Sequence, residues 1–523
     1  MFRIFWGETH HNTHQVGMTP EKYDEILSNA ASHLDFYSAA YYTACSEAFR
    51  EGGHPVELSG KRPIVLEGWK PRERLDKEWA EVREATKRRN SPGRFVTFPG
   101  YEWQGDGSSG DHNVFGMSED DLPLLRVNKV GELYAGIRGK KAVAIPHHVW
   151  YRPGLRGRDW SVFDETLSPF CEVYSVHGCS ETDEEYIGLR VNSHMGPGFG
   201  AGAYQYALDR GYHIGAICST DGWDEMPAHY GRGMMACLAK ELTRESLWEA
   251  FLARRVYGVT GDRIDLDFRI GDAIMGEIVT VRGPRRISVG VSGLDALDRI
   301  ELLRNGRVIA THCHQGTWEL PPPGRRCRFR VRIEAGWGPR PNEMDEILRR
   351  WSGEVRVEGG RMIGFRPCWI SPGQGQPAFS GGSASFEMLT STRHVSERSQ
   401  NADVLEFEAD PAAEMLVRMN GLEERGKVAD FAACSREMWF KDECVRLLSE
   451  KAGVKPFSPE RMDVYHHCAF KVKIHRPIPE SGYAARWEYV DESPLSGEAN
   501  YRIRVEYRNG QRAWSSPIWV RPG

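Results

Sequence analysis

The first half of the chain alternates short apolar runs with stretches whose apolar residues recur at helical spacing. The apolar runs, which predict strands, span 2–6, 34–40, 94–99, 141–146, 171–175 and 213–219. The helically spaced stretches, which predict helices, span 20–32, 77–89, 203–210 and 245–255. Strands alternating with helices are typical of a parallel sheet or barrel. The pattern therefore predicts an α/β unit over residues 1–262.

After residue 262 the pattern changes to one typical of a mostly β domain. Asn305-Gly306 separates two strand-like runs, which predicts a hairpin, and residues 508–511 predict another. Alternating residues predict strands at 326–334, 354–361 and 501–507. Residues 263–523 are expected to form a sandwich-like domain with helical insertions near 342–350 and 433–452. We expect a loop at 373–385 and a packed final strand within AWSSPIWV (513–520).

Composition narrows the class of protein. A chain of 523 residues is too long for one core, and its hydrophobic content of 40% suits a globular protein. The net charge of −5 gives no sign of nucleic-acid binding. The sequence has no signal-peptide core and no run of about 18 apolar residues, so we expect a cytoplasmic protein without a membrane span. Its 11 cysteines include no CxxC pair, which favours reduced thiols.

Residues that can bind metal follow the predicted strands. The segment GETHHNTH (7–14) contains three histidines, and histidines or carboxylates recur in 99–116, 144–150, 172–178 and 218–224. A metal site needs several nitrogen and oxygen donors that converge on one ion. Loops at the carboxyl ends of barrel strands can supply them from one face. The sequence therefore predicts a metal-dependent hydrolase.

In this order the segments resemble the polymerase-and-histidinol-phosphatase (PHP) superfamily of metal-dependent phosphoesterases. The chain is more closely similar to a branch in which a PHP-type barrel precedes a C-terminal β-domain. VYGVTGDRI (256–264) and AWSSPIWV carry that closer similarity. The resemblance implies a distorted (β/α)7-type barrel at 1–262, followed by the sandwich-like domain at 263–523.

The resemblance also implies a set of metal ligands. A first site would comprise His10, Asn12, Glu102 and Asp221, and a second would comprise Glu102, His112 and His147. Asn12 stands where the superfamily has the second histidine of its HxH motif, and an amide oxygen is a weaker donor. We expect one or two divalent ions, with Zn, Mn and Fe all compatible with such a mixed site.

Two departures from the superfamily pattern remove a third metal site. Tyr41-Tyr42 stands where the superfamily has an Asp-His pair, and Trp223 stands where it has a histidine. The charge of a phosphate would then be met by Arg152, Arg156 or Arg158 in the loop after His147. Alternatively the substrate is not a phosphate, and the aromatic side chains stack on a sugar or another ring.

Roles follow from these placements. The candidate catalytic residues are Glu102, Asp221, Tyr42 and His148. The candidate substrate-binding residues are His11, His14, Tyr41, Arg152, Arg156, His177 and Trp223. Each histidine in these sets also has a purely structural interpretation, and Asp106 and Asp111 are interpreted as turn residues.

Three functions stay open at this point. The first is a phosphoesterase-like hydrolase that uses a metal-activated water. The second is a metal-assisted hydrolase or lyase acting on a non-phosphate substrate such as a carbohydrate. The third is a degenerate barrel that keeps metal only for its fold. The expected partner is a small-molecule phosphoester or an oligosaccharide, with neither nucleic acid nor membrane involved.

Overall fold

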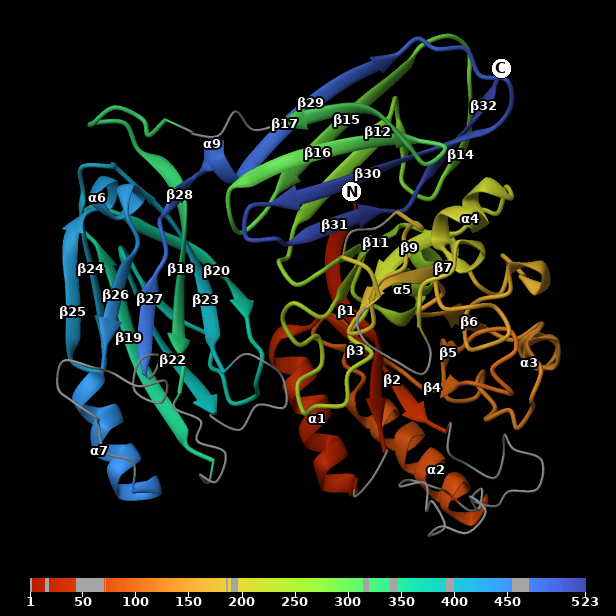
Figure 1. Ribbon diagram of the computed structural model, residues 1–523, viewed down its shortest axis with the longest axis horizontal. Coiled ribbons are helices and arrows are strands. Elements are labelled where there is room, and N and C mark those ends of the chain that lie inside the picture. The colour runs from red at the N-terminus through yellow and green to blue at the C-terminus, as the bar shows by residue number, and fades with distance from the viewer. Residues whose placement is uncertain are drawn as a thin grey trace.

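The computed structural model describes residues 2–14, 18–43, 70, 72–184, 187–189, 196–313, 319–338, 346–391, 399–453 and 470–523. The fold is mixed α/β, with more strand than helix (Figure 1). In the described ranges, none of the helices combines the length and the hydropathy that a membrane span requires.

The N-terminal unit contains two sheets and most of the helices. One sheet runs in the order β11-β10-β1-β2-β4-β5-β6, and β7 lies between β8 and β9 in the other. The strands of the first sheet are β1 (Arg3–Thr13), β2 (Phe36–Tyr42), β3 (Val96–Phe98), β4 (Gly100–Trp103), β5 (His112–Gly116), β6 (Ala142–Pro146), β10 (Met234–Ala239) and β11 (Val256–Val259). The second sheet comprises β7 (Phe170–Ser175), β8 (Gly178–Cys179) and β9 (Gly215–Cys218). The helices are α1 (Pro20–His33), α2 (Arg72–Arg89), α3 (Val130–Ile137), α4 (Tyr204–Asp209) and α5 (Arg244–Leu252).

The four predicted helices are confirmed, and their ends have local causes. In α1, Thr19 accepts a hydrogen bond from the backbone N–H of Lys22, and Pro20 occupies the first turn. In α5, Thr243 accepts from the backbone N–H of Ser246. Helix α2 begins at Arg72, earlier than predicted, because its first turn is charged and lacks the apolar spacing used for the prediction.

The sheet is less regular than the pattern predicted. β1 is parallel to β2 and antiparallel to β10, while β5 is antiparallel to both β4 and β6. Strand β1 also continues to Thr13, through most of the segment 7–14, which was predicted to follow the strand. Its polar residues are buried and paired with β2 across a register shift between Glu8 and His11. A hydrophobic pattern does not detect a strand whose buried face is polar.

The remaining strands form two further bodies (Figure 1). Above the N-terminal unit lie β12 (Asp265–Ile270), β13 (Ala273–Ile274), β15 (Arg285–Ser292) and β29 (Ala484–Asp491), which form a four-stranded sheet. Six strands extend the large sheet: β14 (Ile278–Val281), β16 (Leu297–Arg304), β17 (Arg307–Cys313), β30 (Ala499–Tyr507), β31 (Arg512–Ser515) and β32 (Ile518–Pro522). Because β31 pairs with β11, the chain end is hydrogen-bonded to the N-terminal unit.

The third body, on the left of Figure 1, has its own hydrophobic core, to which two sheets contribute side chains. One sheet comprises β18 (Cys327–Gly336), β20 (Arg361–Cys368), β23 (Asn401–Ala409), β26 (Arg436–Trp439), β27 (Lys471–Ile474) and β28 (Ile478–Pro479). The other comprises β19 (Leu348–Val357), β21 (Ala378–Ser380), β22 (Ser383–Ser391), β24 (Glu414–Met419) and β25 (Leu422–Lys427). The helices of the C-terminal half are α6 (Val428–Ala433), α7 (Lys441–Ala452) and α9 (Glu480–Tyr483).

Several C-terminal predictions are confirmed and others need correction. The Asn305-Gly306 hairpin joins β16 to β17, with positive φ at both residues. The helix predicted near 342–350 is wrong at its end, where β19 begins at Leu348, and residues 342–345 lie outside the described residues. The segment 373–385 includes β21 and the start of β22. AWSSPIWV forms parts of two strands, β31 and β32, because Pro517 separates them.

Candidate metal centre

His10 lies inside β1 and is fully buried. Its Nδ1 is 2.8 Å from Oε2 of Glu172 on β7. Its Nε2 is 3.2 Å from Oδ1 of Asp221 and has no hydrogen-bond partner. When Nδ1 carries the proton and donates it to Glu172, Nε2 is left with a lone pair that can bind a metal ion beside Asp221. A histidine oriented in this way by a carboxylate is the usual arrangement of a metal ligand.

The loop after β9 brings Asp221 to His10. The backbone N–H of Asp221 donates to the carbonyl of His10 (2.8 Å), and the N–H of Asn12 donates to the carbonyl of Gly222 (2.8 Å). Asp221 has φ +51°, a left-handed conformation that costs a non-glycine residue about 1 kcal/mol or more. Asn12 donates its side-chain amide to Oδ1 of Asp221 (2.9 Å), while its own buried Oδ1 has no partner.

Glu8 holds this loop in place. Its carboxylate accepts hydrogen bonds from the backbone N–H groups of His10, Thr220 and Ala228. Burial raises the pKa of Glu8 to about 7, although the hydrogen bonds of His10 and Thr220 oppose the shift. Glu8 therefore belongs to the framework that joins β1 to the loop.

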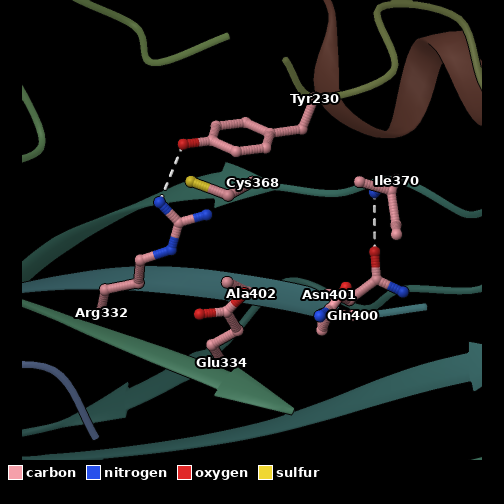
Figure 2. Close-up of a pocket in the computed structure, with 8 residues that line it drawn as sticks. All are labelled: Tyr230, Arg332, Glu334, Cys368, Ile370, Gln400, Asn401 and Ala402. Carbon is pink, nitrogen blue, oxygen red and sulfur yellow. Dashed lines mark hydrogen bonds between the residues drawn. The ribbon is translucent and has the colours of Figure 1, made fainter. Parts of the chain in front are cut away.

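The same loop is anchored at Tyr230 by the third body (Figure 2). Arg332 on β18 donates to the Tyr230 hydroxyl (2.8 Å), and the hydroxyl donates to Oδ1 of Asp262 (2.7 Å). The backbone N–H of Tyr230 donates to the carbonyl of Trp369 (2.9 Å). Tyr230 and Arg332 also line a small cavity, and neither His10 nor Asp221 is among its lining residues.

Glu102 and His147 complete the inner part of the site. Oε1 of Glu102 accepts from the Gln104 amide (2.6 Å) and lies 3.8 Å from Nε2 of His147. Oε2 of Glu102 and both ring nitrogens of His147 are buried without a hydrogen-bond partner. The His147 and His10 rings are 4.1 Å apart. Burial lowers the pKa of His147 well below its usual value, so its ring is neutral, as a metal ligand must be.

Eight residues form four overlapping groups in which the possible ligand atoms lie within 4.8 Å of one another. The groups are His10–Glu102–His147, His10–Glu172–Asp221, Asp111–His147–His148 and His148–His177–Asp221. Among the described residues, His112 belongs to none of these groups. Its Nδ1 lies 3.1 Å from the carbonyl of Gly110, and its buried Nε2 has no partner.

The chemistry of this donor set fits a divalent metal. Imidazole nitrogens and carboxylate oxygens are the donors that Zn, Mn and Fe accept. A buried polar atom without a partner costs free energy, and buried carboxylates cost more unless a cation compensates them. Unpartnered atoms of His10, Glu102 and His147 belong to one such group, and His10 also shares a neighbouring group with Glu172 and Asp221. An ion would satisfy these atoms.

Two acidic residues of the cluster were not identified from the sequence as functional. Glu172 lies in a buried and mostly apolar strand. A carboxylate in such a strand indicates a functional or paired residue, because carboxylates are almost never fully buried unless paired. The interpretation of Asp111 as a turn residue is wrong. It is fully buried, lies 3.2 Å from Nε2 of His148 and pairs with Arg156.

The outer residues surround this cluster. Trp223 is 43% exposed, and its ring meets that of Tyr42 edge-on at 4.4 Å. The Tyr42 hydroxyl is 3.4 Å from the Gln104 amide that holds Glu102. His177 lies between Asp221 and Tyr151.

The three arginines in the loop after His147 have different surroundings. Arg156 forms an ion pair with Asp111, and burial, which lowers its pKa, is outweighed by the carboxylates of Asp111 and Glu102. Arg152 is exposed, with its guanidinium over the ring of Phe199. Arg158 is fully buried and donates to the carbonyl of Ser109, so it supports the loop and is not available to a substrate.

Three of the predicted substrate-binding residues are placed in the protein interior. His11 points away from His10, and its two ring nitrogens contact the Tyr37 hydroxyl (3.0 Å) and the carbonyl of Asp224 (2.7 Å). The Tyr41 hydroxyl donates to Glu78 (2.9 Å). His14 is buried against the rings of Tyr23 and Tyr41, and burial lowers its pKa to about 3. All three side chains are buried, and their contact with a substrate stays a prediction.

Comparisons with known proteins give distant similarities. No protein-family model matches the chain. An uncharacterised protein of Chlamydia pneumoniae is 28% identical over 269 residues, which are 45% of this chain and 40% of the relative. Uncharacterised proteins of Chlamydia muridarum (26%, covering 43% and 40%) and Chlamydia trachomatis (25%, covering 42% and 39%) are similar. The chain therefore matches less than half the length of each relative.

One solved structure is a two-domain protein from Bacteroides vulgatus containing a predicted PHP-like metal-dependent phosphoesterase. It is 12% identical and has a TM-score of 0.34, with 58% of this chain and 79% of that chain covered. That TM-score is too low to establish a shared fold. The function of the chain is therefore inferred from the residues of the site.

Proposed function

We propose that the chain is a metal-dependent hydrolase, most closely of the phosphoesterase type, acting through one or two divalent ions of Zn, Mn or Fe. The observation that carries this proposal is the group of His10, Glu102 and His147, whose buried donor atoms lack partners and which shares His10 with the group that contains Asp221. Such atoms are costly in an interior that offers them no cation.

The inner ion would be held by His10, Glu102, His147 and Asp221, with the amide oxygen of Asn12 as a further donor. These residues would hold an ion whose chemistry is that of a Lewis acid, which activates water and polarises the substrate. Glu172 orients His10 through Nδ1, and Gln104 fixes one oxygen of Glu102 so that the other faces the site. A second ion has a set predicted from sequence, Glu102, His112 and His147, and His112 stays a predicted ligand of it.

Charge recognition and proton transfer would fall to the outer residues. Arg156 forms an ion pair with Asp111, and burial, which lowers its pKa, is outweighed by the charges of Asp111 and Glu102, which raise it. Its guanidinium would bind an anionic group of the substrate. Arg152 stays a candidate for the same role at the surface. His148 Nε2 beside Asp111 and the hydroxyl of Tyr42 are candidate positions for holding a proton.

A non-phosphate substrate is the second candidate function, and the exposed Trp223 favours it. Its ring and that of Tyr42 offer an apolar surface at which a sugar or aromatic ring could stack. In this case the same metal chemistry would cleave a glycosidic or other bond, and Arg156 would bind a carboxylate or hydroxyl. The third candidate is a metal-binding barrel without catalysis.

A substrate panel separates these candidates. The purified chain is loaded with Mn, Zn or Fe and assayed on phosphomonoesters, phosphodiesters and oligosaccharides. The proposal expects turnover of a phosphoester that is abolished by Glu102→Ala and retained in Glu119→Ala, whose carboxylate pairs with Arg244 elsewhere. Turnover of carbohydrate alone would favour the second candidate, and full metal loading without any turnover would favour the third.

The proposal also covers the architecture of the chain and its substrate. It includes a distorted (β/α)7-type barrel at 1–262, a sandwich-like domain at 263–523 and a small-molecule or oligosaccharide substrate. The strands of the N-terminal unit belong to two separate sheets, so a barrel there would be distorted.

A further inference from the structure

We propose that a second divalent cation binds between His148, His177 and Asp221, on the solvent side of the His10 centre. This inference rests on the proposed function, because Asp221 would be shared between the two ions. It places the second ion away from the Glu102–His112–His147 set that the sequence predicts.

The carboxylate of Asp221 faces two different imidazoles. Oδ1 lies 3.2 Å from Nε2 of His10, and Oδ2 lies 3.0 Å from Nε2 of His177. Neither Oδ2 nor the His10 nitrogen forms a hydrogen bond of good geometry, although both are buried. A carboxylate whose two oxygens serve two nearby centres is the bridging ligand of dinuclear metal sites.

The contacts of His177 favour a cation beside its Nε2. Nδ1 of His177 is 2.8 Å from the Tyr151 hydroxyl. When Nδ1 carries the proton and donates it to Tyr151, Nε2 presents a lone pair to Oδ2 of Asp221 at 3.0 Å. Two lone pairs at this separation repel each other unless a proton or a metal ion lies between them.

The presence of His148 favours a metal ion over a proton shared between His177 and Asp221. A histidine and an aspartate that share a proton need no third donor. Here His148 belongs to the same group, and its buried Nδ1 has no hydrogen-bond partner. His148 also has φ +34°, so both it and Asp221 are held in a left-handed conformation at the cluster. A third converging donor is expected of a metal site.

The position of this group indicates which ion would contact the substrate. The His177 side chain is 15% exposed, whereas those of His10 and His147 are fully buried. A site with three protein ligands keeps coordination positions open, as catalytic metal sites do. The outer ion would therefore exchange faster than the inner ion and would bind an oxygen of the substrate.

The test is a metal titration of the full chain with His177→Ala. The protein is stripped with a chelator, titrated with Co²⁺ alone, and followed by visible absorption and by elemental analysis after gel filtration. The wild type is expected to bind two ions per chain with different affinities. His177→Ala is expected to weaken the outer site by more than about 100-fold, beyond the loss typical of outer partners. The inner site should change less than about twofold.

The matched control is His213→Ala. His213 has the same 15% side-chain exposure and pairs with Glu498 at 2.7 Å, outside the cluster. Both ions should be retained in this variant. If far-UV circular dichroism shows that His177→Ala has not folded, His177→Gln takes its place, because it keeps the side-chain volume and lacks the imidazole.

The outcomes separate this inference from the proposed function. Retention of two ions by a folded His177 variant, or a wild type that binds one ion only, overturns the inference and leaves the hydrolase proposal standing. Loss of the second ion in His112→Gln but not in His177→Ala would overturn it in favour of the set predicted from sequence. A wild type that binds no Co²⁺ would contradict both.

Discussion

Replacing Glu172 with glutamine removes the charge that orients His10 while keeping the size of the side chain. The Glu172 carboxylate meets Nδ1 of His10 at 2.8 Å, and both side chains are at most 1% exposed. Burial raises the pKa of Glu172, and the nearby His10 opposes that shift. In Glu172→Gln the amide oxygen can still accept from Nδ1–H, but the imidazole becomes less basic and its orientation less certain.

The expected effect is on metal affinity, with little effect on the apoprotein. Partners of metal-binding histidines are worth about 10- to 100-fold in affinity, or about 1.4–2.8 kcal/mol at 1.4 kcal/mol per tenfold. The upper part of this range applies here, because His10 and Glu172 are in direct contact and both side chains are buried. The free energy of unfolding of the apoprotein should not fall by a similar amount, since glutamine is isosteric and removes a buried charge.

Competition with a chromophoric chelator measures this affinity for Zn and Mn. Glu498→Gln is the matched control, because Glu498 pairs with His213 at 2.7 Å outside the site. A Glu172→Gln variant that binds metal within twofold of the wild type would refute the orienting role. Equal losses in both variants would attribute the effect to general destabilisation.

Three further perturbations test the framework and the outer surface. Burial raises the pKa of Asp403 to about 7 from 3.8, so the folded state binds more protons and the free energy of unfolding falls as pH rises from about 4 to about 7. Asp403→Asn should remove this slope and be more stable than the wild type by up to about 4 kcal/mol at pH 8, measured by denaturant unfolding at both pH values; parallel slopes would contradict it. Glu181→Ala leaves Arg502 buried without its carboxylate and should cost about 3–5 kcal/mol in unfolding free energy, whereas the exposed Glu423→Ala should cost less than about 1 kcal/mol. Trp223→Ala should raise KM about fivefold, from about 1 kcal/mol of ring contact, without changing metal content; an unchanged KM would exclude Trp223 from the substrate surface.

Local patterns were sufficient to predict most of the described helices and several strands of the N-terminal unit. Helical spacing and the Thr19 and Thr243 positions determine α1 and α5, and Asn305-Gly306 determines a hairpin. The resemblance to the PHP superfamily also predicted that His10, Glu102 and Asp221 would lie close together, and His10 shares one group with Glu102 and another with Asp221.

What the sequence could not predict depends on long-range contacts. Tyr41 and His11 follow the same alternation as their neighbours, and only the packing of α2 and of the loop at Asp224 assigns them to the interior. Asp111 resembles a turn residue because it follows a glycine, yet its carboxylate is buried beside His148. Strand β5, which is antiparallel to β4, was not predicted, because its sequence HNVFG is short and begins with two polar residues.

The metal content of the purified chain shows whether the group of His10, Glu102 and His147 holds an ion. The protein is analysed for bound metal, stripped with a chelator, and its thermal unfolding is measured before and after addition of Zn or Mn. We expect at least one tightly bound divalent ion per chain, lost in Glu102→Ala. We also expect stabilisation by about 2.7 kcal/mol when free metal is 100 times the dissociation constant. A wild-type protein that binds no divalent ion and unfolds at the same temperature with and without metal would show that this cluster is not a metal site.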